Sequence, residues 1–156
     1  MTTTATAAQA APAPVSRDRR LRIAGIVISC IGLGIAIYLT YVHYTGIKVA
    51  CLSSGGCETV QSSTYAKLGG IPVPVLGLVG YIGILGSFVL LRGDLARMAG
   101  FGMALVGFLF SAYLTYRELF TIKAICQWCV GSAVCMTLLM VITTIRAVRG
   151  EPSVAR

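Results

Sequence analysis

The sequence has few charged residues, and this scarcity excludes an ordinary soluble domain. Only 12% of its 156 residues are Asp, Glu, Lys or Arg, whereas 56% are hydrophobic. Charged residues make up about 25% of a typical soluble domain. A chain of this length lacks the polar side chains needed to cover a core, so lipid must be the solvent for much of its surface.

Charge is also missing over long continuous stretches. Four segments contain no charged residue: 23–42 (20 residues), 68–91 (24), 98–116 (19) and 124–145 (22). About 20 apolar residues of helix cross the hydrocarbon core of a bilayer. The sequence therefore predicts an all-α integral membrane protein, a four-transmembrane-helix bundle. The expected helices are Leu21–Tyr44, Val75–Leu91, Met98–Leu119 and Ala124–Ile145.

The charges that are present favour one side of this topology. Nine positive residues precede the first run, lie between the second and third, or follow the last: Arg17, Arg19, Arg20, Arg22, Arg92, Arg97, Arg146, Arg149 and Arg156. The other side has four: Lys48, Lys67, Arg117 and Lys123. The positive-inside rule then places both termini in the cytoplasm and the connections 45–72 and 117–124 outside. The net charge of +8 is thus a topology signal, and we expect no nucleic acid partner.

The ends of the chain are expected to lie outside the bundle. Residues 1–20 begin with an Ala/Thr/Pro-rich segment and predict a disordered cytoplasmic tail, and 147–156 predict a second tail. The four-helix catalytic domain is then 21–146. The first apolar run is too long for a signal-peptide core, so we expect it to be retained as a helix.

The first outer connection has a composition of its own. A short half-helix is expected from Cys57 to Lys67, ended by Gly69 and Gly70. Prolines follow at the start of the second long helix, where their fixed backbone suits a first turn. At the other outer connection, we expect Arg117 and Glu118 to be solvated charges that end the third helix.

Four cysteines fall on the predicted outer side, which is the oxidising side. Cys51 and Cys57 lie in the first outer connection, and Cys126 and Cys129 lie where the fourth helix begins. The N–H groups at a helix N-terminus stabilise a thiolate, which makes Cys126 reactive. Cys129 is one turn deeper, about 4.5 Å along the axis. This pair can close a disulfide at the membrane boundary and meet a lipid-soluble electron acceptor.

The cysteines could also have roles that involve no redox chemistry. Both pairs could be structural disulfides in a membrane scaffold. A four-cysteine zinc site is disfavoured because five residues separate the first two cysteines, and we expect no metal. His43 is the sole histidine and is expected to be an interfacial side chain. Cys30 and Cys135 are expected to pack as small apolar residues within helices.

The order of these motifs resembles the vitamin K epoxide reductase family. The shared features are a spaced pair in Cys-Leu-Ser-Ser-Gly-Gly-Cys, a Val-Gln-Ser-Ser segment that ends at Ser63, a Pro/Gly-rich start of the second helix that includes Gly77, and a later Cys-Gln-Trp-Cys. The resemblance covers roughly residues 20–146. The four-helix oxidase DsbB has its two cysteine motifs in the reverse order.

The resemblance implies a role for each cysteine. Cys129 lies next to a quinone, either menaquinone or ubiquinone. Cys51 and Cys57 carry electrons from a thioredoxin-fold protein, with Cys51 meeting that partner and Cys57 exchanging with Cys126. Ser63 matches a serine near the quinone.

At two positions expected to lie in the quinone pocket, the sequence differs from the vertebrate enzyme of this family. Val73 stands where the vertebrate enzyme has a quinone-binding asparagine, and Ala133 stands where it has a tyrosine. These differences favour a bacterial, single-domain type over an epoxide reductase. We expect no fused thioredoxin domain, so the expected partner is a separate DsbA-like protein.

The sequence as a whole therefore predicts an inner-membrane enzyme. It would oxidise the dithiol of a periplasmic or extracytoplasmic DsbA-like protein, pass the electrons to a membrane quinone and so support disulfide bond formation. The alternative is a thiol-driven quinone or vitamin K epoxide reductase, whose important product is the small molecule.

Overall fold

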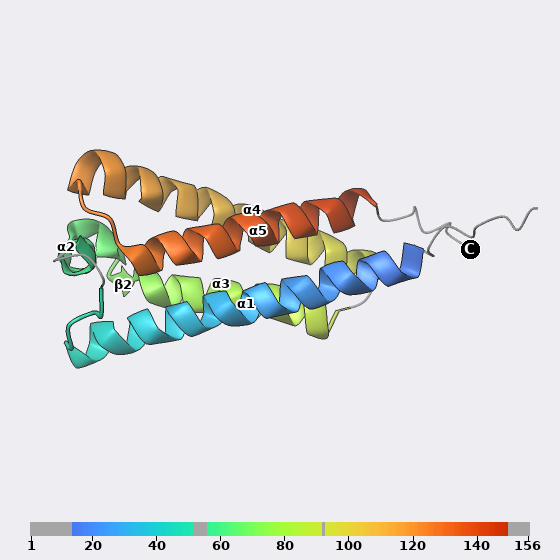
Figure 1. The fold of residues 1–156 in the computed structure, drawn as a ribbon, viewed down its shortest axis with the longest axis horizontal. Helices are drawn as coiled ribbons and strands as arrows, with labels where there is room; N and C mark the ends of the chain where they lie inside the picture. Colours follow the sequence, from blue (N-terminus) through green and yellow to red (C-terminus); the bar gives the residue numbers. More distant parts are fainter. Residues whose placement is uncertain (1–13, 52–55, 92, 150–156) are drawn as a thin grey trace, which may run out of the picture.

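The structure is a computed structural model, and it describes residues 14–51, 56–91 and 93–149. Four long helices, α1 (Pro14–Thr45), α3 (Val73–Val89), α4 (Gly93–Arg117) and α5 (Gln127–Val148), run side by side and alternate in direction (Figure 1). Each packs against two neighbours, because α1 contacts α3 and α5, and α4 contacts α3 and α5. The predicted bundle of four helices is therefore present.

The four helices differ in their capacity to cross a membrane. In the described residues, three helices are long and apolar enough to span one: Arg17–Thr45, Gly93–Ile122 and Gln127–Val148. The helix α3 is apolar but has only 17 residues, which rise about 25 Å. Large apolar side chains such as Ile23, Val27 and Ile31 point outward from α1 at four-residue spacing. The outer surface of the bundle therefore suits lipid contact.

The bundle core is formed mainly by facing sides of α3 and α5. Tyr81, Ile84 and Phe88 are buried on the α3 face and pack with Leu139 of α5. The helix α1 approaches this face closely through a glycine, since a Cβ added at Gly32 would overlap the Tyr81 ring. Small residues that allow helices to approach are the usual basis of packing in membranes.

The first helix is longer than the sequence predicted. It begins at Pro14, so residues 14–20 are helical, whereas residues 1–13 and 150–156 of the expected tails lie outside the described residues. A proline suits the first turn of a helix. Asp18 also accepts a hydrogen bond from Arg146 of α5 at 3.0 Å, which holds this segment against the bundle. The start of α1 and the end of α5 therefore lie at the same end of the molecule (Figure 1).

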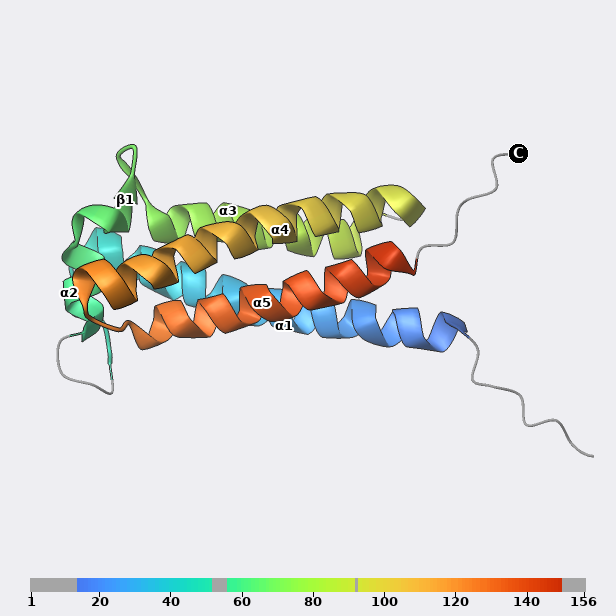
Figure 2. The ribbon, with the colours of Figure 1, turned by 90° about the horizontal axis from the view of Figure 1, so that it is seen from above.

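The outer connection also differs from its prediction. The expected half-helix is divided into α2 (Gly56–Ser62) and a short 3₁₀ turn, η1 (Thr64–Ala66). An antiparallel hairpin follows, with β1 (Lys67–Leu68) paired to β2 (Ile71–Pro72), and it projects sideways (Figure 2). Gly69 and Gly70 have φ values of 59° and 87°, so they form the hairpin turn and do not end a helix. The all-α prediction is thus correct except for this small sheet.

The connection between the last two helices brings the second cysteine pair into position. The helix α4 begins five residues before the predicted start and continues into a π-helical turn, η2 (Glu118–Ile122). Lys123 then adopts a left-handed conformation with φ 53°. Residues 123–126 are in neither helix nor strand, and Cys126 is the N-cap of α5, so α5 begins three residues later than predicted.

Candidate active site

The four candidate cysteines lie at one end of the bundle, in two different states. Cys51 and Cys57 form a disulfide that joins the segment before α2 to the start of α2, with a Cα–Cα distance of 6.4 Å. Cys126 and Cys129 are free thiols. One pair is thus oxidised and the other reduced in the same molecule.

The two pairs meet through Cys57 and Cys126. These residues are 2% and 0% exposed and belong to one buried cluster with Val60. The contact depends on a glycine, since a Cβ added at Gly56 would lie 2.6 Å from the carbonyl oxygen of Ile125. The start of α2 therefore rests directly on the chain before α5, and this brings one sulfur of each pair into the same cluster.

The surroundings of Cys126 favour its thiolate. Its sulfur accepts a hydrogen bond from the backbone N–H of Cys129 at 3.4 Å, as expected for an N-cap. The pKa of the Cys126 thiol is lowered, chiefly because the Cys129 thiol donates a hydrogen bond to it, with further help from the backbone N–H groups of Cys129 and Trp128. Burial and the nearby Glu118 carboxylate act in the opposite direction. Cys126 is thereby prepared for nucleophilic exchange.

Two aromatic residues fix the backbone just before Cys51. The indole Nε1 of Trp128 donates to the carbonyl oxygen of Ala50 at 2.8 Å, and the N–H of Ala50 donates to the hydroxyl of Tyr38 at 3.0 Å. The two rings also contact each other, with centroids 4.8 Å apart. Both polar groups of Ala50 are therefore held, and we call this arrangement the Ala50 clamp. Trp128 lies between the cysteines of the reduced pair, so the clamp connects the two pairs.

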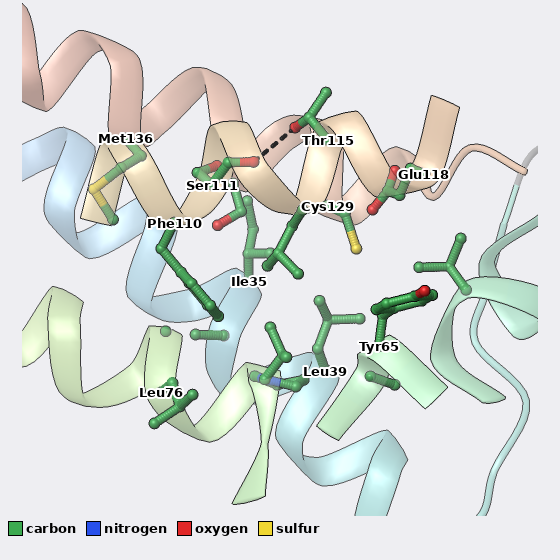
Figure 3. A pocket seen from close by; sticks show the side chains of 18 of the residues that line it. Ile35, Leu39, Tyr65, Leu76, Phe110, Ser111, Thr115, Glu118, Cys129 and Met136 are labelled. Carbon is green, nitrogen blue, oxygen red and sulfur yellow. Dashed lines mark hydrogen bonds between the residues drawn. The ribbon is translucent and has the colours of Figure 1, made fainter. Parts of the chain in front are cut away.

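A mostly apolar cavity lies inside the bundle below the cysteines. All four long helices, α2 and the segment after it contribute to its wall, and Cys129 is among the residues that line it. Figure 3 shows Cys129 and Glu118 on one side, with Tyr65 and Leu39 facing them. The cavity therefore reaches the inner sulfur of the reduced pair, whereas Cys126 contacts the disulfide.

The residues predicted for the quinone side do not all reach this cavity. Ser63, Val73 and Gly77 line it. The Ser63 hydroxyl donates to the carbonyl oxygen of Val60 at 2.7 Å, so donation to a ligand requires this bond to break. Ala133 is half-buried and is not among the lining residues, although its neighbour Ser132 is.

Several polar residues of the site were missed or misread from the sequence. Glu118 was expected to be a solvated charge, but it is 5% exposed and lines the cavity. Tyr81, deeper in the cavity wall, hydrogen-bonds to the carbonyl and hydroxyl oxygens of Ser132 at 2.9 and 3.0 Å. In the described part of the chain, no group of three or more His, Cys, Asp or Glu residues could hold a metal ion.

Comparison with known proteins places this arrangement in a family. The chain is 47% identical over 45 residues to the thiol-disulfide oxidoreductase LTO1 of Arabidopsis thaliana, a match that covers 28% of this chain and 12% of the plant protein. The chain thus corresponds to a small part of that relative. The sequence model of the Vitamin K epoxide reductase family matches residues 23–144, which include α3, α4, most of α1 and α5, and both cysteine pairs. The chain is therefore a member of the vitamin K epoxide reductase family.

Proposed function

We propose that this chain is a membrane thiol–disulfide oxidoreductase that takes electrons from a dithiol protein and delivers them to a quinone. The observation that carries the proposal is the serial arrangement of its cysteines. Cys57 and Cys126 share a buried cluster, and Cys129 lines the cavity. Electrons therefore have a route from a disulfide near the outer surface to a compartment within the bundle.

The exchange steps follow from the chemistry of thiolates and disulfides. A thiolate of the partner attacks the Cys51–Cys57 disulfide at Cys51, and a second partner thiol completes the exchange, so that the partner is oxidised and the pair is reduced. Cys57 then attacks Cys126 of a closed Cys126–Cys129 disulfide, and Cys129 leaves. Attack of Cys51 on Cys57 restores the first disulfide and leaves Cys126 and Cys129 as thiols. The structure has this last distribution of bonds.

The cavity fits a quinone as the final acceptor. Its wall is mainly apolar, through residues such as Leu39, Val73 and Phe110, and a few polar groups are placed within it. Ser63 and Gly77 would lie beside the head group, with Cys129 next to it. A bound quinone supplies an acceptor for two electrons and two protons. Menaquinone and ubiquinone both suit such a site.

The partner and the membrane face complete the proposal. The positive-inside rule places the cysteine end on the extracytoplasmic side of the inner membrane, with α3 as the fourth span. A separate thioredoxin-fold protein of the DsbA type is the proposed electron donor, because its thiolate can attack an accessible disulfide. Cys51 is the more exposed member of that disulfide.

A direct test is the capture of the Cys57–Cys126 bond. In a Cys129→Ala variant, Cys126 can attack Cys57 and release the Cys51 thiol, which can only reverse this one step, so we expect part of the acid-quenched protein to carry a Cys57–Cys126 disulfide in the mass spectrum of a digest. Cys51→Ala should give the same bond. Cys30→Ala is the matched control, since Cys30 lies on the exposed face of α1. If alanine at each of the four cysteine positions left quinone-linked dithiol oxidation intact, the proposal would be wrong.

The alternative function, reduction of a quinone epoxide, can be tested separately. Val73 presents an apolar side chain to the cavity, and Ala133 is not part of its lining. Neither position therefore offers a hydrogen-bond donor to an epoxide oxygen. We expect oxidation of a dithiol protein with menaquinone to proceed, and no turnover of vitamin K epoxide with dithiothreitol. Epoxide turnover at a comparable rate would favour the alternative.

A further inference from the structure

Glu118 is a buried carboxylate that the exchange steps above do not use. It is the first residue of η2 and is 5% exposed. Its Oε2 accepts a hydrogen bond from the backbone N–H of Cys126 at 3.4 Å, and its carboxyl group is also within hydrogen-bond reach of the Cys129 thiol. Glu118 thus contacts both residues of the reduced pair.

The charged neighbour of Glu118 on α4 does not point at these contacts. The Arg117 Nε donates to the hydroxyl of Tyr113 at 3.2 Å, and its guanidinium lies 4.8 Å from the centre of the Tyr65 ring. Arg117 is therefore engaged by aromatic groups. The carboxyl of Glu118 instead faces the cysteines and the cavity (Figure 3).

We propose, on the basis of the function above, that Glu118 is the acid–base residue of the Cys126/Cys129 pair, giving a proton to the Cys129 sulfur when their disulfide opens and taking it back when the disulfide closes. Thiol–disulfide exchange has to move protons as well as electrons. Cys126 is fully buried and Cys129 faces an apolar cavity, so bulk water has poor access to either sulfur. A carboxyl group in contact with the leaving sulfur can supply and accept the proton that bulk water cannot.

The opening step balances without any other reactant. The Cys57 thiolate attacks the Cys126 sulfur, the Cys57–Cys126 bond forms and the Cys126–Cys129 bond breaks. The electron pair of the broken bond goes to Cys129, and the protonated Glu118 carboxyl gives its proton to that sulfur. Glu118 becomes a carboxylate and Cys129 a thiol. Closing of the dithiol would need a quinone as two-electron acceptor: the Glu118 carboxylate would remove the Cys129 proton, the Cys126–Cys129 bond would form, and both electrons would pass to the quinone.

The test is the opening rate in the full-length protein with no quinone present. Dithiothreitol reduces the Cys51–Cys57 disulfide of the fully oxidised protein in detergent, samples are quenched with acid, and maleimide labelling followed by peptide mass spectrometry times the appearance of the Cys129 thiol. Glu118→Gln keeps an acceptor for the Cys126 N–H but removes the proton donor. General acid–base catalysis contributes about 10²- to 10⁴-fold to a rate, so we expect opening to slow by at least ~10-fold. Closing, started with menadione, should slow as well.

Glu58→Gln is the matched control for Glu118→Gln. It removes one carboxylate from the same end of the molecule, where Glu58 is exposed on α2, and its opening rate should stay within about twofold of wild type, as expected for a screened surface charge. If Glu118→Gln does not give folded protein, Glu118→Asp replaces it, because the shorter side chain withdraws the carboxyl from Cys129. We expect at least ~3-fold slower opening for that variant, a small part of what acid–base catalysis supplies.

The possible results separate this inference from the proposed function. A folded Glu118→Gln protein that opens at the wild-type rate overturns the role of Glu118, and so does a wild-type rate in Glu118→Asp where that variant is the one tested. The electron route would still stand in both cases. If reduction of the Cys51–Cys57 disulfide never opens the Cys126–Cys129 bond in the wild-type protein, the proposed function itself fails.

Discussion

The Ala50 clamp gives a quantitative test of how the two cysteine pairs are kept together. Trp128→Phe removes the donor to the Ala50 carbonyl but leaves an aromatic ring, and Tyr38→Phe removes the acceptor of the Ala50 N–H. Neither substitution replaces a cysteine, and residue 128 keeps its backbone N–H near Cys126. Any change in electron transfer between the pairs would therefore come from the position of the segment that includes Cys51.

The expected loss of docking of the Cys51 segment follows from the number of hydrogen bonds removed. A neutral hydrogen bond contributes about 1 kcal/mol net to a folded arrangement, and about 1.4 kcal/mol corresponds to a tenfold change in an equilibrium. Each single variant should therefore lower the ratio of docked to undocked segment by about fivefold, and the double variant by about thirtyfold if the bonds are independent. The exchange rate between Cys57 and Cys126 should fall by up to the same factors.

The assay is the rate of Cys57–Cys126 formation in a Cys129→Ala background that keeps its Cys51–Cys57 disulfide. The reaction is started by a jump from acid to neutral pH and quenched with acid at timed intervals. Tyr41→Phe is the control, because Tyr41 lies on the same helix with an exposed ring. A double variant with a rate within twofold of its parent would refute the clamp. A double variant no slower than either single variant would show that the two bonds act as one unit.

The remaining predictions concern pH and helix packing. The thiolate is the nucleophile, so the rate of Cys126 attack on the Cys51–Cys57 disulfide should rise with pH. Because the pKa of Cys126 is lowered, the midpoint of this rise should lie below the ordinary thiol pKa of about 8.5. Cys129→Ala should move the midpoint upward, since the Cys129 thiol is the main cause of the shift; a midpoint at the ordinary value in wild type would contradict this assignment. Gly32→Ala should cost about 1–3 kcal/mol of folding stability through overpacking and lower the thermal midpoint in detergent. Gly34→Ala should not, because a Cβ added at Gly34 would meet no neighbouring atom within 4 Å. Equal midpoints for the two variants would mean that the close approach of α1 is not needed.

The long helices and the common location of the cysteines followed from the sequence because both depend on strong, local signals. Uninterrupted apolar runs can be read without knowledge of contacts. The place of Cys126 at the start of the fourth long helix was also predictable, since it depends on where an apolar run begins, although the helix starts three residues later than predicted. The exact start of α1 was less predictable, because Asp18 gains its helix-stabilising partner, Arg146, from the other end of the chain.

The hairpin at residues 67–72 was missed although a signal for it exists. Two glycines between Leu68 and Ile71 match a two-residue turn with positive φ values. We read them as the end of a helix, because glycine also ends helices. Only the short pairing of the flanking residues, two on each side, distinguishes the two interpretations.

Glu118 shows the limit of sequence reasoning more clearly. A glutamate at the end of an apolar helix is ordinarily solvated, and no periodic pattern indicates otherwise. Its burial depends on the π-helical turn that it begins and on the chain returning so that the N–H of Cys126 reaches its carboxylate eight residues later. Such a contact follows from the path of the connection, which local propensity does not specify.

The proposed division of labour between the two cysteine pairs would explain why the site has both a buried contact and a cavity. A disulfide that meets a water-soluble protein has to be accessible, whereas a thiol that meets a lipid-soluble acceptor has to lie within the bundle. A single pair could not satisfy both conditions without moving across the membrane boundary. The contact of Gly56 with Ile125 joins the two environments by placing Cys57 against Cys126, so only one short exchange is needed between them. That exchange releases Cys129 into surroundings where a thiolate is poorly solvated, which is where the carboxyl of Glu118 lies.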